Sequence, residues 1–114
     1  MANIIAKKGD RETALAMFRE LAQREPGNHQ HPYNVGRMYV LLERYDEALP
    51  HLEWSLKLAP DNGGALLTLV IAHVKRGDHA RALSYYERYV SEGYPRRKEL
   101  EDELGWVVGS EEKR

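Results

Sequence analysis

Apolar side chains recur at helical spacing along most of this sequence. In segment 11–24 they follow the three-and-four spacing that places side chains on one helical face, at Ala14, Leu15, Phe18, Leu21 and Ala22. The same spacing predicts further helices over 31–42, 45–58, 64–76 and 79–91, with a short helix at 2–8 and a last one starting near Pro95. The pattern therefore predicts an all-α chain.

Turn residues separate the predicted helices. Gly9 and Asp10 predict the end of the first helix and the N-cap of the second, and Gly77 and Asp78 repeat this pair further along. The polar stretches 25–28 and 59–63 predict turns as well. Short turns of this kind favour neighbouring helices that pack antiparallel.

A shift of 34 residues places much of the sequence on itself. It takes Ala48 back to Ala14 and forward to Ala82. It also relates Leu52 to Phe18 and Tyr86, and Pro60 to Pro26. A fixed period of this length is typical of helical repeats, in which a hairpin cannot bury its apolar face alone and stacks on its neighbours.

The middle repeat resembles the tetratricopeptide repeat, whose pattern is W-x2-L-G-x2-Y, then A-x3-F, then P. Four residues match it in order, Gly36, Tyr39, Ala48 and Pro60, and Leu52 stands at the position of F. The third repeat departs from the pattern at Val70, His73 and Tyr94, where the family usually has Gly, Tyr and Pro. The resemblance covers residues 2 to about 95. It implies an α-α superhelix of about two and a half helical hairpins, with a concave face that binds proteins or peptides and no catalysis.

We expect a single domain over residues 1–114. Its parts would be a partial repeat, two full repeats, a capping helix and a tail, at 1–28, 29–62, 63–94, 95–108 and 109–114. The capping helix would cover the third repeat with Leu100, Leu104 and Val107. The first repeat retains only residues 2–8 of its first helix, which leaves Ile4 and Ile5 short of neighbours. This apolar edge predicts a weak homodimer.

Composition excludes several kinds of site. The formal net charge is -1, so we expect neither nucleic acid nor a membrane surface as partner. The absence of cysteine excludes disulfides, thiolate catalysis and zinc–cysteine sites. Residues 1–8 lack the apolar core of a signal peptide, and the longest apolar run, 65–74, is too short to cross a bilayer, so a cytoplasmic protein is expected. No catalytic, phosphate-binding or metal motif occurs, and we expect no enzymatic activity, no cofactor and no metal site.

Repeat columns that vary in residue type are free for binding. On the first helices of the hairpins they give a candidate groove formed by Asn3, Lys7, Tyr33, Asn34, Arg37, Leu41, Leu67, Thr68, Ile71 and Lys75. The lining is partly apolar and partly cationic, which suits an amphipathic or extended segment of some acidic character. The alternative is that Leu67 and Ile71 pack on the C-terminal helix.

Asn3 and Asn34 fall on two columns with which some members of the resembled family grip the C-terminal carboxylate of a chaperone. The basic columns of that clamp hold Gly64 and Thr68 instead, so the match is partial. His73 lies in a tyrosine column and is expected to be a core residue with a satisfied ring nitrogen.

Trp54 occupies a column whose other members, Glu20 and Arg88, are charged. That column is therefore predicted to face solvent on the convex side. His51, Trp54 and Leu58 share a helical face, and together with Ile4 and Ile5 they form a candidate convex or dimer contact. The alternative is a single half-covered surface tryptophan.

The sequence therefore predicts a protein–protein interaction module. Its expected role is to bind a peptide or helical segment of a partner protein in the concave groove, as a scaffold, an adaptor or a co-chaperone-like protein. Two alternatives remain open, a self-assembly module and a regulatory domain of a larger protein.

Overall fold

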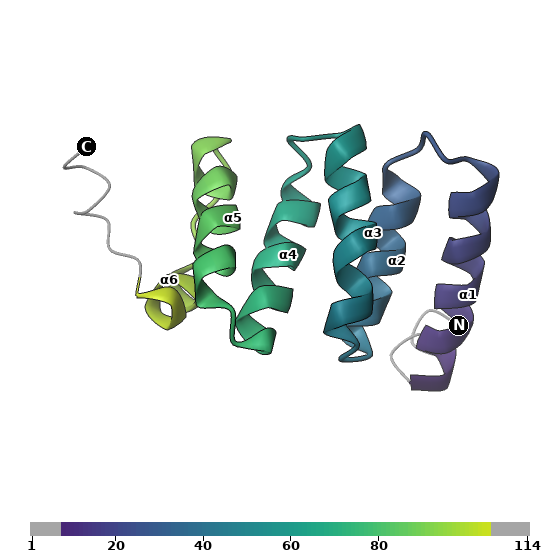
Figure 1. Cartoon of the computed structure of the whole chain (residues 1–114), viewed down its shortest axis with the longest axis horizontal. Helices are drawn as coiled ribbons and strands as arrows, with labels where there is room; N and C mark the ends of the chain where they lie inside the picture. Colours follow the sequence, from purple (N-terminus) through teal and green to yellow (C-terminus); the bar gives the residue numbers. More distant parts are fainter. Residues whose placement is uncertain (1–7, 106–114) are drawn as a thin grey trace.

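The computed structural model describes residues 8–105, and the regular elements of that part are all helices. They are α1 (Lys8–Arg24), α2 (Gln30–Leu41), α3 (Tyr45–Leu58), α4 (Gly63–Arg76), α5 (His79–Ser91) and α6 (Lys98–Leu104). Figure 1 shows α1 to α5 standing side by side in sequence order, with α6 at the far end of the row. The principal extents of 46 × 29 × 24 Å reflect this row. The prediction of an all-α repeat superhelix is confirmed.

Helix bounds agree closely with the sequence pattern from α2 to α5. The predicted break at Gly9 and Asp10 is wrong, because α1 begins at Lys8 and continues through both residues. Glycine inside a helix costs only about 1 kcal/mol relative to alanine, which neighbouring contacts can offset. The matching Gly77 does end its helix, with a left-handed φ of 81°. The rest of the predicted helix at 2–8 lies outside the described residues.

Each hairpin is held close by small residues at its crossing point. A Cβ atom added to Gly36 in α2 would lie 2.5 Å from Leu52 Cγ in α3, so the leucine side chain occupies the space that glycine leaves. Ala48 and Ala82, the repeat-equivalent alanines of α3 and α5, are fully buried. The small residues of the repeat pattern therefore set the distance between paired helices.

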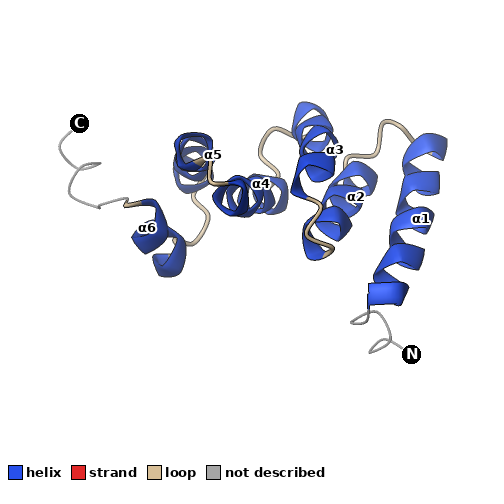
Figure 2. Ribbon diagram, turned by 60° about the horizontal axis from the view of Figure 1, so that its bottom comes forward, coloured by secondary structure: helices blue, strands red, loops and turns tan. Residues whose placement is uncertain are grey.

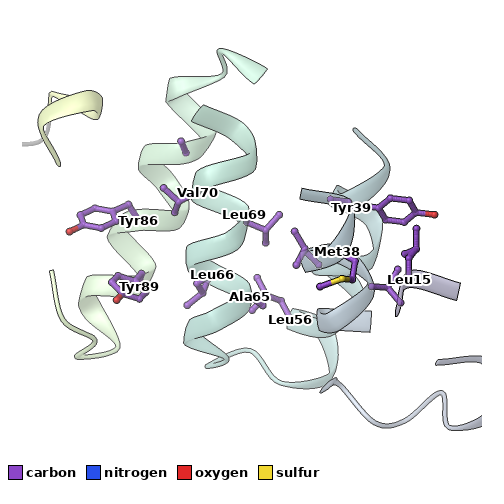
Figure 3. Packing of buried hydrophobic residues seen from close by; sticks show 14 residues of the cluster. Leu15, Met38, Tyr39, Leu56, Ala65, Leu66, Leu69, Val70, Tyr86 and Tyr89 are labelled. Carbon is purple, nitrogen blue, oxygen red and sulfur yellow. The ribbon is translucent and has the colours of Figure 1, made fainter. Parts of the chain in front are cut away.

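The core continues through the whole row of helices without a break between repeats. Figure 3 shows side chains from α1 to α5 meeting along it, among them Leu15, Met38, Tyr39, Leu56, Ala65, Leu66, Leu69, Val70, Tyr86 and Tyr89. Hairpins that share one apolar core stabilise each other, as expected of stacked repeats. This continuity fixes the relative positions of the helices that line the candidate groove.

The first helices of the hairpins form the inner side of the row. Helix α2 contacts α4 directly, although α3 lies between them in sequence, whereas α3 and α5 have no comparable contact. Elements on the inside of a curve lie closer together than those on the outside. Figure 2 shows α3 and α5 on one side of the row and α2 and α4 on the other. The concave side is therefore the side of α2 and α4.

Helix α6 packs on the end of α5. It is shorter than the predicted capping helix, with Leu100 and Leu104 half-buried against the core, and Val107 lies outside the described residues. The buried Tyr86 hydroxyl donates to Glu101 Oε2 at 2.5 Å and accepts from the Arg97 backbone N–H at 2.8 Å. Burial, together with the hydrogen bond to Glu101, raises the pKa of Tyr86 to about 12. One tyrosine thus anchors both the start and the middle of α6.

Candidate protein-binding groove

The two helices of the concave side carry no acidic residue. Neither α2 nor α4 contains an aspartate or glutamate, whereas α1, α3 and α5 each contain at least one. Arg37 on α2 and Lys75 on α4 are exposed, and within residues 8–105 neither forms an ion pair. Both of these helices are therefore free of carboxylates and carry cations, in a chain whose formal net charge is -1.

The other predicted groove residues lie along the same two helices at different depths. Leu41 is exposed, and the half-buried set comprises Tyr33, Asn34, Leu67 and Ile71. Asn3 and Lys7 lie outside the described residues. Leu67 packs against the core while still lining a surface pocket, so it is only partly covered.

Thr68 does not fit its predicted place in the groove. Its side chain is buried, and its hydroxyl donates to the Gly64 carbonyl within α4 at 2.7 Å. A threonine on a helix can satisfy its hydroxyl in this way with the carbonyl four residues earlier. The side chain is therefore used inside the helix and is not available to a ligand.

A polar pocket lies at the start of α2. It measures about 260 Å³ and is lined by His29, Gln30, Tyr33, Asn34 and Asn62. Asn62 caps α4 by accepting from the Ala65 N–H at 3.2 Å. The amide group of Asn62 also lies 3.2 Å from His29 Nδ1, which ties the start of α2 to the start of α4.

A larger pocket of about 430 Å³ lies at the start of α4. It is lined by Gly63, Gly64, Leu67, Tyr89, Tyr94, Pro95 and Arg97. A Cβ on Gly63 would lie 2.6 Å from the Tyr94 ring, and one on Gly64 would lie 2.6 Å from the Tyr33 hydroxyl. The two glycines therefore make room for one tyrosine on each side.

Of these seven lining residues, only Leu67 belongs to the predicted groove, and the other six, among them Tyr89, Tyr94 and Arg97, were not predicted to line it. Tyr89 is a core residue that is 3% exposed, and it also lines the pocket. Tyr94 carried a usable signal, because it stands in a column where the resembled family has proline. Arg97 follows the last repeat and has no column that would have marked it.

The convex candidates do not form a single exposed patch. Trp54 is half-buried and borders a shallow pocket of about 240 Å³ with Pro50, Glu53 and Lys57. The His51 ring stacks on Tyr39 at a centroid distance of 5.6 Å, and Leu58 is 39% exposed. Ile4 and Ile5 lie outside the described residues. The geometry of Trp54 therefore matches the alternative of a half-covered surface tryptophan.

His73 is a core residue, with only one ring nitrogen satisfied. It is 1% exposed, its Nδ1 lies 3.4 Å from Arg76 Nη1, and its Nε2 has no partner among the described residues. Burial lowers the pKa of His73. In the same part of the chain, no group of three metal-ligating side chains occurs, and no helix is long and apolar enough to cross a membrane.

Comparison with known proteins places these features in a family. The family model of the tetratricopeptide repeat matches residues 1–52 and 39–97. Over 84 residues, 74% of this chain, the sequence is 33% identical to a peroxisomal targeting signal receptor of Debaryomyces hansenii and 31% identical to one of Pichia angusta. The chain spans only 14% and 15% of those two proteins. The repeat period, the row of paired helices and the family match show that this chain is a protein-interaction module of the tetratricopeptide repeat family.

Proposed function

We propose that this chain binds a segment of a partner protein in the concave groove formed by α2 and α4. The observation that carries the proposal is the charge of these two helices. Arg37 and Lys75, which form no ion pair within residues 8–105, stand on helices that hold no carboxylate. A bound segment with acidic residues would gain attraction along the groove and would meet no negative side chain on either helix.

The shape of the groove suits a segment better than a globular surface. Its pockets are small and separate, and each opens beside the start of an inner helix. Small pockets along a helical groove accept individual side chains of a peptide, which is how grooves of this kind obtain specificity. The role that follows is that of a scaffold or adaptor.

The named relatives agree with segment binding in general. Both are receptors for a targeting signal, and the matched region is a small part of each. A clamp for a terminal carboxylate has less support here, because Thr68 on one of its basic columns is buried and bonded within α4.

The test begins with peptides selected on the wild-type chain from a random phage-displayed library. Their affinities are measured by fluorescence anisotropy for the wild type and for the double variant Arg37→Glu/Lys75→Glu. We expect this variant to bind at least about tenfold more weakly, a change of about 1.4 kcal/mol. The matched control is Arg19→Glu/Lys57→Glu, which changes the net charge equally on α1 and α3. Binders that lose affinity equally with both variants, or with neither, would contradict groove binding.

A second candidate function is self-association through α1. Met17 is 60% exposed, the largest exposed fraction among the large apolar side chains of the described part. Exposed apolar surface of this kind favours contact with a second copy when the concentration is high. Sedimentation velocity of the wild type and of Met17→Glu separates this role from groove binding.

A further inference from the structure

Two pockets occupy equivalent positions in consecutive repeats. The 34-residue shift that relates the repeats takes His29, Gln30 and Tyr33 of the polar pocket to Gly63, Gly64 and Leu67 of the larger one. The first pocket therefore serves as an internal reference for the second. The differences between the two show what has changed at the start of α4.

In the first pocket, a network of hydrogen-bonded polar groups forms the wall. Ser55 is fully buried and donates to the His29 carbonyl at 2.9 Å, and the Asn62 amide donates to Ser55 Oγ at 3.3 Å. These groups satisfy each other, which leaves a polar cleft of about 260 Å³.

In the second pocket, tyrosines replace that network. The same shift takes Ser55 to Tyr89 and Pro60 to Tyr94. The two rings stack at a centroid distance of 5.3 Å, and the Tyr94 hydroxyl donates to the Asp61 carbonyl. Because residue 63 is glycine, the Tyr94 ring can pack where a Cβ of residue 63 would otherwise clash with it. The result is a pocket of about 430 Å³ with an aromatic wall held in place from two sides.

A cation stands at the rim of this pocket. The Arg97 backbone N–H donates to the Tyr86 hydroxyl at 2.8 Å, and its Nε lies 3.5 Å from the Tyr89 hydroxyl. These contacts hold the residue beside the aromatic wall. Within residues 8–105 its guanidinium forms no ion pair, so it can pair with a carboxylate that approaches from the groove.

We propose that the aromatic pocket, formed by Leu67, Tyr89, Tyr94 and Arg97, receives one aromatic or large aliphatic side chain of an acidic partner segment. This inference rests on the proposed function and specifies its ligand. The apolar wall and Leu67 supply contact for the anchor side chain, while Arg97 joins Arg37 and Lys75 in attracting the carboxylates that flank it. The occupant is thus a protein segment with acidic residues on both sides of a large apolar one.

The probe is a set of nine-residue peptides made of alternating Glu and Ser, capped at both ends, with Phe, Leu, Ala or Lys at the centre. Fluorescence anisotropy measures their affinities at low salt. For the wild type we expect the Phe and Leu peptides to bind at least about tenfold more tightly than the Ala peptide, and the Lys peptide to bind most weakly. The capped ends ensure that no terminal carboxylate contributes.

Two variants alter the pocket in different ways. Tyr94→Pro restores the residue that the family has in this column and removes the aromatic wall. Leu67→Gln keeps the size of the side chain but makes it polar, so it tests the pocket even if Tyr94→Pro fails to fold. We expect both variants to bind the Phe and Ala peptides about equally, with the affinity for the Ala peptide unchanged. Leu58→Gln, the same substitution at an exposed leucine of α3, should retain the preference for Phe.

The outcomes separate the inference from the function on which it rests. If the wild type binds the Phe and Ala peptides alike, or the preference survives both pocket variants, the aromatic pocket is not the anchor site. The same holds if none of the four peptides binds. In each case groove binding itself still stands or falls with the library-selected peptides and the Arg37→Glu/Lys75→Glu variant.

Discussion

His73 and Tyr85 repeat the stacked pair of Tyr39 and His51 with the two residue types exchanged. The His73 and Tyr85 rings lie 5.7 Å apart at an interplanar angle of 8°, and the Tyr39 and His51 rings lie 5.6 Å apart at 30°. A shift of 34 residues takes 39 to 73 and 51 to 85. In both hairpins an aromatic stack therefore joins the first helix to the second at equivalent positions of the repeat.

This exchange predicts that the two columns depend on each other. His73→Tyr or Tyr85→His alone would place two tyrosines or two histidines in a space shaped for one of each. The double variant His73→Tyr/Tyr85→His should recover stability, with a coupling energy of about 0.5–1.5 kcal/mol, the usual range for aromatic pairs. Urea unfolding of the wild type and three variants measures it. Strictly additive effects would show that the two rings do not interact.

The half-buried His51 and the buried His73 predict that the stability of the fold depends on pH. Burial, and then the nearby Arg19, lower the pKa of His51, and burial likewise lowers the pKa of His73. The folded state thus disfavours protonation relative to the unfolded chain, whose histidines titrate near about 6.5. The contribution of these histidines to the free energy of unfolding should be fully present above that pH. It should decrease as the pH falls from there towards the pKa values of the two histidines in the folded state.

Unfolding midpoints measured at several pH values between about 5 and 8 check this prediction. His51→Gln/His73→Gln should show a flatter dependence than the wild type. His79→Gln, at an exposed histidine, is the matched control and should keep the slope. An identical slope in the wild type and the double variant would exclude these two rings as its source.

We expect the stability of the fold to be sensitive to a single methyl group at position 36. Alanine there is favoured by helix propensity, but its Cβ would lie 2.5 Å from Leu52 Cγ. Overpacking should outweigh the propensity gain, so we expect Gly36→Ala to lower the free energy of unfolding by about 1–3 kcal/mol. Gly27→Ala, where a Cβ would meet nothing within 4 Å, should leave it nearly unchanged. Chemical denaturation of both variants is the measurement, and a Gly36→Ala variant at least as stable as the wild type would show that the hairpin can open without cost.

The fold could be predicted from the sequence because each hairpin repeats the same constraints. Ala48 recurs at Ala14 and Ala82, and Pro60 recurs at Pro26, so the period marks the same structural positions in successive repeats. The error at Gly9 and Asp10 has a related cause. A glycine ends a helix only where the backbone turns left-handed, as at Gly77, and the residue type alone does not reveal the backbone angle.

The Tyr86 hydroxyl predicts how firmly α6 is attached. It bonds both the Glu101 carboxylate and the Arg97 N–H, and hydrogen bonds to charged groups contribute about 1.5–3 kcal/mol. Tyr86→Phe should therefore release α6 and speed hydrogen exchange and tryptic cleavage around residues 96–104. Tyr45→Phe, whose hydroxyl has no hydrogen-bond partner within residues 8–105, should not. Equal protection of α6 in Tyr86→Phe and the wild type would mean that Leu100 and Leu104 hold the helix without this network.

The candidate site could be predicted only in part. The groove columns identified Tyr33, Arg37 and Leu67, because residues on one helix face follow the repeat period. The aromatic pocket could not be found in this way, since its wall comes from the end of α5 and the turn that follows. A departure from the pattern, Tyr94 in a proline column, marks that wall, and only its contact with Gly63 shows what the departure does.

Met17 predicts the behaviour of the N-terminal edge. Its repeat equivalents, His51 and Tyr85, are each covered by a ring from the preceding helix, whereas Met17 is 60% exposed. The residue that corresponds to those covering rings is Ile5, which lies outside the described residues. We therefore expect a concentration-dependent dimer through residues 2–15 and the Met17 face, because a second copy can bury the exposed Met17 side chain.

Sedimentation velocity over a wide range of protein concentration checks this expectation. Met17→Glu and Ile4→Glu/Ile5→Glu should shift the wild-type dimer towards monomer, while Leu58→Glu, at an exposed leucine of α3, should leave the equilibrium unchanged. A wild type that stays monomeric at the highest concentration would rule out self-association through this edge.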